Sequence, residues 1–153
     1  MGRIIGLDFG AKTVGVALSD PMRTIASPYE TITREKEGKL RPTLRRIVEI
    51  AKNEEAELIV LGLPLNMDDS RGERALKTEE FRENLERRLM AERMEVPVVL
   101  WDERLSTVGA DEVLEESRIH PRERKQYIDR IAAALILEDY MKNAAPLAAE
   151  EEK

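Results

Sequence analysis

The sequence contains no cysteine and only one histidine, His120. The lack of cysteine excludes disulfide bonds, cysteine-ligated zinc or iron–sulfur clusters and thiol catalysis, and a single histidine excludes a histidine-rich metal site. Aromatic residues make up only 4% of the 153 residues. The hydrophobic share is nevertheless 42%, rich in Ile, Leu and Val, and is large enough to fill the core of one domain.

The chain also lacks a long hydrophobic run. The longest uninterrupted apolar segment, Ile131 to Leu137, is too short to cross a bilayer, and the N-terminal MGRIIGLD resembles a strand and not a targeting leader. We therefore expect a soluble cytoplasmic protein with no membrane partner. The net charge is -6, so any binding to nucleic acid must come from a local basic patch.

The spacing of apolar residues changes along the chain from period two to helical spacing and back. Alternation and short apolar runs predict strands at residues 3–9, 13–19, 25–33, 57–62 and 96–101. Pro28 favours an edge position for the third strand, because proline has no N–H for the ladder. Helical spacing predicts helices at about 41–53, 72–93 and 124–142, and a short helix capped by Ser106 or Thr107.

This order of elements predicts an α/β fold with an RNase H-like layout. The sheet would have five strands and be mixed, with an antiparallel meander followed by parallel strands, and helices would cover both faces. We expect a single domain over residues 1–143. Residues 144–153 end in Glu150 to Lys153 and are expected to form a disordered acidic tail.

Asp8 is the first candidate site residue. Within the predicted strand it shares a face with Ile4 and Gly6, which places a carboxylate in the middle of a sheet. Burying a charge there is costly unless a cation or another partner offsets it. A metal ligand is the preferred interpretation, and the alternative is an aspartate that caps the turn at Gly10.

Asp102 and Glu103 follow the fifth predicted strand. The carboxyl ends of parallel strands form the crevice in which open α/β sheets bind ligands. Because adjacent strand residues point to opposite faces, only one of the two acids shares a face with Asp8. The spacing does not decide which one, and the other could pair with Arg104 or cap the next helix.

Asp129 begins the apolar part of the final predicted helix, with the small residues Ala132 and Ala133 one turn further along. Small residues allow a helix to approach a sheet closely, so Asp129 could reach the region above Asp8. The alternative is a first-turn aspartate favoured by the helix dipole.

Carboxylates from strands and a helix suit Mg²⁺ or Mn²⁺ better than zinc, because thiol and imidazole ligands are missing. Paired metal ions roughly 3.5 to 4 Å apart can activate water and stabilise the leaving oxygen of a phosphodiester. The sequence therefore favours metal-dependent hydrolysis without a side-chain nucleophile.

Basic residues suggest where a nucleic acid would bind. Lys12 in the first turn could meet a phosphate, or could be an ordinary exposed lysine. Arg122, Arg124 and Lys125 belong to the basic segment Ser117 to Lys125, which is predicted as a loop leading into the final helix. A second basic stretch, from Arg34 to Arg46, fits a solvated helix entrance better.

Six motifs in this order resemble the YqgF (RuvX) family. The resemblance extends to about Tyr140 and is most specific at the fifth strand. The motifs are Gly6-Leu-Asp-Phe-Gly10, Gly15-Val-Ala-Leu-Ser-Asp20, Ala26-Ser-Pro28, Gly62-Leu-Pro-Leu-Asn-Met67, Trp101-Asp-Glu-Arg-Leu-Ser-Thr107, and Ile128-Asp129 followed by Ala132-Ala133.

The resemblance implies an RNase H-like nuclease related to Holliday junction resolvases, with a role in trimming the 5′ end of the small-subunit ribosomal RNA precursor. Its motifs assign the acidic set to Asp8, Glu103 and Asp129. The alternatives are resolution of branched DNA junctions and a non-catalytic ribosome-assembly factor that binds structured RNA. The protein is expected to be a monomer or a homodimer, and a two-fold junction would favour the dimer. Ala11 and Asp69 depart from the family pattern, and Asp69 adds negative charge near a possible substrate path.

Overall fold

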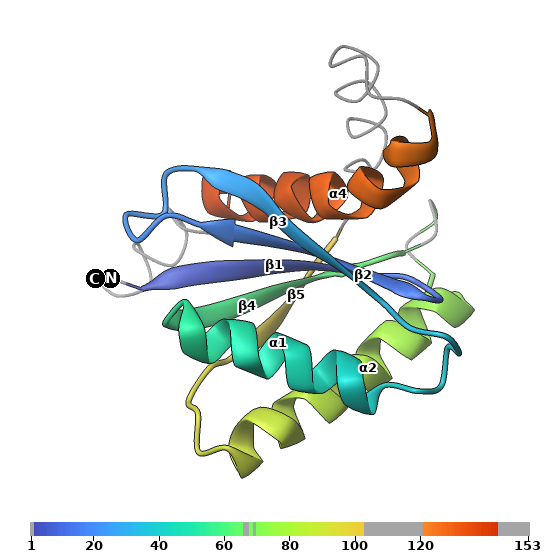
Figure 1. Ribbon diagram of the computed structural model, residues 1–153, viewed down its shortest axis with the longest axis horizontal. Coiled ribbons are helices and arrows are strands. Elements are labelled where there is room, and N and C mark those ends of the chain that lie inside the picture. The colour runs from blue at the N-terminus through green and yellow to red at the C-terminus, as the bar shows by residue number, and fades with distance from the viewer. Residues whose placement is uncertain (1, 66–67, 69, 103–120, 144–153) are drawn as a thin grey trace.

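The computed structural model describes residues 2–65, 68, 70–102 and 121–143. Five strands and three helices lie within these residues (Figure 1). In chain order they are β1 (Arg3–Phe9), β2 (Thr13–Ser19), β3 (Ala26–Thr33), α1 (Arg41–Asn53), β4 (Ala56–Leu63), α2 (Glu73–Ala91), β5 (Val98–Asp102) and α4 (Pro121–Asn143).

The strands form one mixed sheet in the order β3-β2-β1-β4-β5. β2 is antiparallel to both β1 and β3, whereas β4 runs parallel to β1 and β5 runs parallel to β4. Pro28 lies on the edge strand β3, and the register with β2 shifts between Val16 and Ala17, where Ala17 pairs with Pro28. The predicted meander followed by parallel strands, with Pro28 at an edge, is therefore confirmed.

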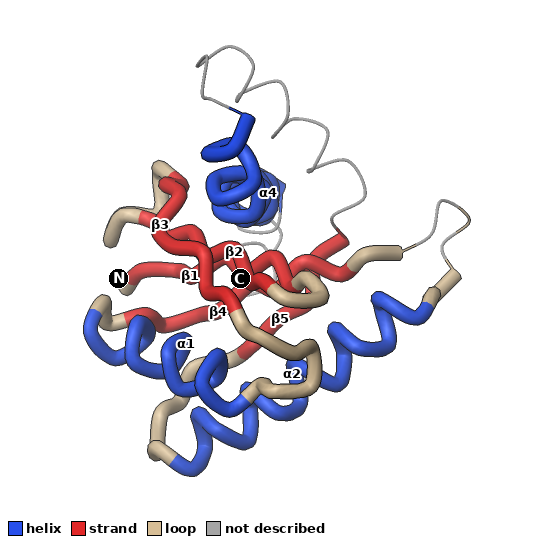
Figure 2. Tube along the Cα trace, turned by 45° about the vertical axis from the view of Figure 1, so that its right-hand side comes forward, coloured by secondary structure: helices blue, strands red, loops and turns tan. Residues whose placement is uncertain are grey.

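Helices cover both faces of the sheet. Figures 1 and 2 show α1 and α2 on one face and α4 across the other. In β1, Ile5 and Leu7 belong to the core on the α1 and α2 side, whereas Ile4 packs with α4. Because side chains alternate along a strand, Gly6 and Asp8 share the α4 face with Ile4. This alternation decides which face carries the candidate carboxylate.

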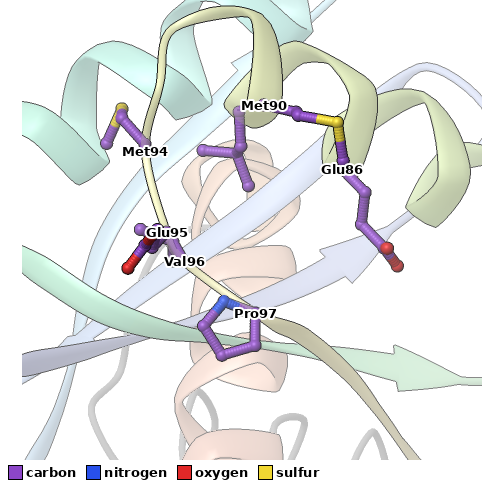
Figure 3. A pocket seen from close by; sticks show the side chains of 7 residues that line it. Glu86, Met90, Met94, Glu95, Val96 and Pro97 are labelled. Atoms are coloured by element: carbon purple, nitrogen blue, oxygen red, sulfur yellow. The ribbon is translucent and has the colours of Figure 1, made fainter.

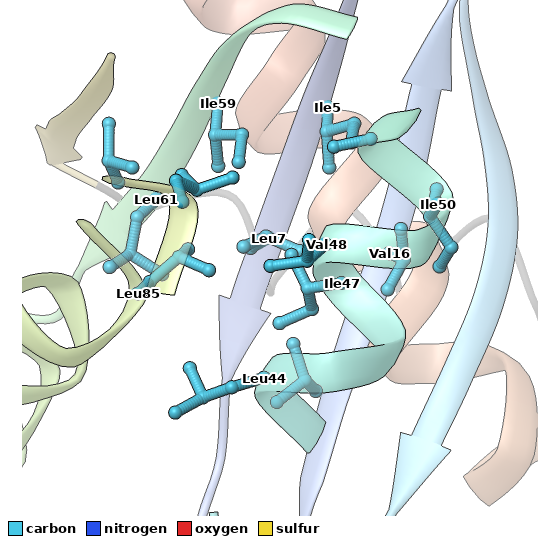
Figure 4. Close-up of a cluster of buried hydrophobic side chains, with 14 of the residues drawn as sticks. Ile5, Leu7, Val16, Leu44, Ile47, Val48, Ile50, Ile59, Leu61 and Leu85 are labelled. Atoms are coloured by element: carbon cyan, nitrogen blue, oxygen red, sulfur yellow. The ribbon is translucent and has the colours of Figure 1, made fainter. Parts of the chain in front are cut away.

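The larger core lies under α1 and α2 (Figure 4). α1 forms where predicted, with a proline in its first turn, and presents an apolar stripe at helical spacing to the sheet. The stripe consists of Leu44, Ile47, Val48 and Ala51, all buried. Burying these side chains holds α1 to the sheet.

α4 lies unusually close to the strands beneath it. A Cβ placed on Gly6 would lie 2.8 Å from the carbonyl oxygen of Ala133, so no side chain fits between helix and strand there. Ala132 and Ala133 are both buried, as their small size predicted. The apolar run from Ile131 to Leu137 predicts that the middle of this helix is covered almost completely. This prediction is only partly met, because Ile131 and Leu135 are partly exposed.

The final helix begins at Pro121 and not at about residue 124. Proline suits the first turn because its missing N–H would have no partner there. The short helix expected after Ser106 lies outside the described residues. Of the helices in the described part of the chain, none combines the length and hydrophobicity of a membrane span.

Candidate active site

Asp8 lies one residue before the end of β1 and is partly buried. Its backbone pairs with that of Gly15 on the neighbouring strand β2. Because Gly15 has no side chain, the backbone of α4 can approach the sheet directly beside Asp8. The carboxylate therefore lies at the carboxyl end of β1 on the face that α4 covers.

Asp129 reaches this face from α4. The backbone of Asp129 lies directly over Gly15: a Cβ on Gly15 would be 1.9 Å from the Asp129 carbonyl oxygen. The carboxylate of Asp129 turns toward the same sheet face, where its Oδ2 accepts a hydrogen bond of 2.7 Å from the Thr13 hydroxyl. Since Gly15 pairs with Asp8, the structure brings Asp8 and Asp129 to adjacent positions on one face.

Asp129 follows Pro121, the first residue of α4, by eight residues. It is therefore two turns into the helix, beyond the first-turn N–H groups that stabilise an acidic side chain. The alternative interpretation of Asp129 as a first-turn residue is wrong.

Asp102 is the last residue of β5 and pairs with Leu63 on β4. The preceding Trp101 packs on the α4 side, whereas Leu100 packs on the α1 and α2 side. By alternation Asp102 shares the face of Leu100, opposite to that of Asp8. Glu103, the residue that the family motif selects, lies outside the described residues.

Among the described residues, no three His, Cys, Asp or Glu side chains lie close enough to hold a metal ion together. Two of the three acids assigned by the motifs, Asp8 and Asp129, are among these residues. Both supply carboxylate oxygens, the ligands that hard divalent cations prefer. The donor chemistry of this pair therefore fits Mg²⁺ or Mn²⁺.

A buried arginine holds the turn that joins β1 to β2, and sequence reasoning missed it. The guanidinium of Arg34 donates from Nη2 to the carbonyl oxygens of Gly10 and Ala11, at 2.6 and 2.8 Å. The backbone N–H of Arg34 also donates to the carbonyl of Lys12, at 2.9 Å. Arg34 is only 8% exposed, and burial, followed by the nearby Arg74, lowers the pKa of its guanidinium. The turn after Asp8 is thus fixed from the face opposite to α4.

Phe9 joins this turn to the core. The Cζ atoms of Arg34 and Arg74 each lie 4.9 Å from the centre of the Phe9 ring, which stacks on Phe81 at 4.2 Å. Glu37 accepts hydrogen bonds from Arg74 and Lys77, and these bonds lower the pKa of its carboxyl. Contacts of β1 with α2 and the β3–α1 connection therefore immobilise the residues that follow Asp8.

The predicted substrate-binding residues fall into two groups. Lys12 is exposed in the β1–β2 turn, at the same end of the sheet as Asp8. Arg122, Arg124 and Lys125 are part of α4 and not of a loop, which corrects the prediction for this segment; their side chains lie outside the described residues. A rigid helix and not a loop would therefore carry these charges.

Two members of the second basic stretch are already engaged. Arg34 binds the turn described above, and Arg46 forms ion pairs with Glu30 and Glu49. The other basic residues of this stretch are exposed, and they are Lys36, Lys39, Arg41 and Arg45. This exposure agrees with the expected solvated helix entrance.

The apolar strand that ends at Trp101 predicts this ring in the core, but the side chain is only partly buried. Its ring packs edge-on against Tyr140 at 5.3 Å, and its Nε1–H donates to Asp139 at 2.7 Å. In the loop after β4, Asp68 accepts hydrogen bonds from the backbone N–H and the hydroxyl of Ser70, which is turn-forming behaviour. Asp69, which departs from the family pattern, lies outside the described residues.

An open groove lies between the end of α2 and the start of β5 (Figure 3). It is lined by Leu89, Met90, Met94, Val96 and Pro97, with Glu86 and Glu95. The start of β5 is at the opposite end of the sheet from Asp8, since β5, β4 and β1 are parallel. The groove is therefore separate from the candidate site.

Sequence reasoning also missed the roles of Thr13, Gly6 and Gly15. A signal for the glycines was present, because a glycine inside a strand often marks a close approach of another backbone. No comparable local signal marks Thr13, whose partner is 116 residues away in the chain.

Known proteins resemble this chain over nearly its full length. A family model described as "RuvX: Holliday junction resolvase" matches residues 2–143. A protein of Lachnospira eligens named "Putative pre-16S rRNA nuclease" is 55% identical over 141 residues, which cover 92% of this chain and 97% of that protein. A Bacillus licheniformis protein of the same name is 44% identical over 139 residues, covering 91% and 96% of the two chains.

Solved structures share the fold at low sequence identity. RuvC of Thermus thermophilus in complex with a Holliday junction substrate aligns with a TM-score of 0.58 and 15% identity, covering 94% of this chain and 98% of RuvC. The yeast mitochondrial Holliday junction resolvase Ydc2 aligns with a TM-score of 0.53 and 11% identity, covering 99% and 82%. These likenesses, together with the sheet topology, establish the RNase H-like fold.

Proposed function

The chain belongs to the RuvX family, a family of nucleases, and we propose that it is a metal-dependent nuclease with Asp8, Glu103 and Asp129 as metal ligands and catalytic residues. The observation that carries this proposal is the convergence of Asp8 and Asp129. They come from a strand and a helix more than one hundred residues apart, and they occupy adjacent positions on one sheet face. Asp102 lies on the face opposite to that of Asp8, which argues against Asp102 as the third ligand, and the family motif selects Glu103.

When bound, Mg²⁺ or Mn²⁺ would supply the Lewis acidity for attack of water on a phosphodiester. Asp8 would hold the ion from the end of a buried strand whose following turn is fixed by Arg34. Asp129 would hold it from a helix packed backbone to backbone on the sheet. Rigid supports of this kind keep ligand oxygens in place without reorganisation during the reaction.

The substrate we propose is the precursor of 16S ribosomal RNA, processed at its 5′ end during ribosome biogenesis in the cytoplasm. The names of the curated relatives, at 42 to 55% identity for the first five, support this assignment. A branched DNA junction is the second candidate, supported by the description of the family and by the likeness to RuvC bound to a junction. A two-fold symmetric junction would favour a homodimer, whereas RNA trimming needs only a monomer.

Lys12 and the start of α4 would bind the phosphate backbone. Lys12 is exposed in the turn three residues after Phe9, the last residue of β1. Arg122, Arg124 and Lys125 precede Asp129 by one to two helical turns. In the sequence, Lys12 thus follows Asp8 closely, and the three basic residues of α4 precede Asp129 closely.

The test is a cleavage assay of the purified protein with Mn²⁺ on two substrates. They are a 5′ fragment of precursor 16S ribosomal RNA and a four-way DNA junction. Asp8→Asn serves as the inactive control. We expect cleavage of the RNA fragment that requires the metal ion and is lost in the control. Cleavage of the junction alone would select the resolvase function, and tight binding of RNA without cleavage would indicate a non-catalytic assembly factor.

A further inference from the structure

Thr13 is the first residue of β2 and its backbone is held from two sides. Its carbonyl oxygen accepts the backbone N–H of Gly10 at 2.7 Å, and its backbone pairs with that of Thr33 on β3. The side chain is partly buried. Because threonine is branched at Cβ, such a fixed backbone restricts the directions that its hydroxyl can take.

The hydroxyl of Thr13 lies on the face that carries the candidate site. Thr13 and Gly15 are two residues apart in β2, so both lie on the α4 face. Gly15 is the residue that pairs with Asp8 on β1. The Thr13 Oγ1 donates to Oδ2 of Asp129 at 2.7 Å, a short distance typical of a hydroxyl bound to a carboxylate. One oxygen of the Asp129 carboxylate is thus tied to the strand next to Asp8.

We propose that Thr13 is a positioning residue that fixes the orientation of the Asp129 carboxylate for metal binding. This inference rests on the proposed function of Asp129 as a ligand. A helix fixes the Cα of Asp129, but its carboxylate can still rotate about two side-chain torsions. The hydrogen bond from Thr13 selects one orientation of the carboxylate, in which Oδ2 points to β2, the strand next to that of Asp8. Hydrogen bonds to metal-binding carboxylates commonly change metal affinity about 10- to 100-fold.

The chain offers a matched control in Thr31. Thr31 on β3 pairs with Gly15 and lies on the same sheet face as Thr13. Its hydroxyl also bonds to α4, accepting from Nε of Arg130 at 3.1 Å. Thr31→Val therefore removes a threonine contact with the adjacent residue of the same helix while leaving both carboxylates untouched.

The experiment measures Mn²⁺ binding to the purified protein without substrate, by electron paramagnetic resonance of the free ion. Thr13→Val replaces the hydroxyl with a methyl group of similar size, Thr13→Ser keeps the hydroxyl, and Thr13→Ala is a second hydroxyl-free variant in case the valine variant does not fold. We expect the Mn²⁺ dissociation constant to rise about 10-fold or more in Thr13→Val and Thr13→Ala. Thr13→Ser and Thr31→Val should bind like the wild type. The Mn²⁺ concentration for half-maximal cleavage should shift by the same factor.

Three outcomes would overturn the inference in distinguishable ways. Unchanged Mn²⁺ affinity in Thr13→Val, while Asp8→Asn and Asp129→Asn lose binding, would remove the role of Thr13 and leave the proposed function intact. An equal loss in Thr31→Val would show that helix docking in general, and not orientation of Asp129, controls affinity. Wild-type protein that binds no Mn²⁺, or binds it equally well without Asp8 and Asp129, would refute both the inference and the metal centre.

Discussion

The carbonyl oxygen of Asp129 lies where a side chain on Gly15 would have to begin. The distance from that oxygen to a Cβ built on Gly15 is 1.9 Å, far below any van der Waals contact. The backbones of α4 and β2 are therefore in direct contact at Gly15, which pairs with Asp8 on β1. The absence of one side chain sets the position of a candidate catalytic carboxylate.

Replacing Gly15 with alanine should separate α4 from the sheet at this point. The added methyl group meets backbone atoms, which cannot rotate away, so the free energy of unfolding should fall by at least about 1 to 3 kcal/mol. Cleavage should be lost at temperatures at which the variant is still folded. Urea denaturation and a cleavage assay on the same samples measure the two effects.

Gly38→Ala is the control for this prediction. A Cβ at Gly38 meets no atom within 4 Å, and its φ is not in the left-handed region. Its stability should stay within about 0.5 kcal/mol of the wild type. Equal stability of Gly15→Ala and Gly38→Ala would contradict the close approach of α4.

Isosteric replacement of the three acids should abolish cleavage without unfolding the protein. Asp8→Asn, Glu103→Gln and Asp129→Asn each remove a ligand charge and retain the side-chain shape. Because Asp8 and Asp129 share a face, removing either charge should also raise the thermal midpoint in metal-free buffer. Asp102→Asn, on the opposite face, should keep its cleavage activity. A near-normal turnover in one of the three variants would exclude that residue as a ligand.

Arg34→Met should destabilise the protein through the β1–β2 turn. The substitution removes the donors to the carbonyls of Gly10 and Ala11 and leaves these acceptors without their partner. Loss of hydrogen bonds from a charged donor predicts a decrease of about 1.5 to 3 kcal/mol in the free energy of unfolding. Arg45→Met, at an exposed position of α1, is the matched control and should change stability little. Similar unfolding curves for the two variants would show that Arg34 does not hold the turn.

Two basic surfaces can be compared as sites for the phosphate backbone. Replacing Arg122, Arg124 and Lys125 together with alanine should weaken nucleic-acid binding with little change in single-turnover cleavage at saturating substrate. The logarithmic salt dependence of binding should become shallower by about 0.7 to 0.9 for each phosphate group that the variant no longer neutralises. The comparison variant replaces the exposed residues Lys36 and Lys39 of the β3–α1 connection and Arg41, the first residue of α1. A loss of affinity and salt dependence only in this second variant would place the substrate there instead.

Asp20 should titrate far below an ordinary aspartate. Its carboxylate accepts hydrogen bonds from the backbone N–H of Ile25 and from the hydroxyl and N–H of Thr24, and these bonds lower its pKa from 3.8 to about 2. The unfolded chain therefore takes up the proton first as the pH falls. The contribution of Asp20 to stability is present above about pH 4 and is lost as the pH falls toward 2. Carboxyl chemical shifts followed by NMR should give a midpoint near 2, and a midpoint near 4 would show that the β2–β3 turn does not hold this carboxylate.

Local sequence patterns correctly predict the order of the elements, the bounds of α1, the edge position of Pro28 and the face of Asp8. These features depend on local periodicity and on single-residue chemistry, which an isolated segment already contains. They also single out Asp129 and the small residues Ala132 and Ala133, but they place the start of α4 too late and Arg122, Arg124 and Lys125 in a loop. A proline followed by charged residues fits a loop or a first helical turn equally well, and only the continuation of the helix decides between them.

The residues that support the candidate site are recognisable only from the packed fold. Thr13 bonds to a residue 116 positions away, Gly15 accommodates the backbone of α4, and Arg34 crosses from the end of β3 to the β1–β2 turn. Each of these roles depends on a partner that is distant in sequence, and the local pattern around Thr13 or Arg34 is that of an ordinary strand end. The periodicity of a chain reports which side of a strand or helix is buried, but not which atoms meet there, because those contacts exist only after the sheet and α4 have packed together.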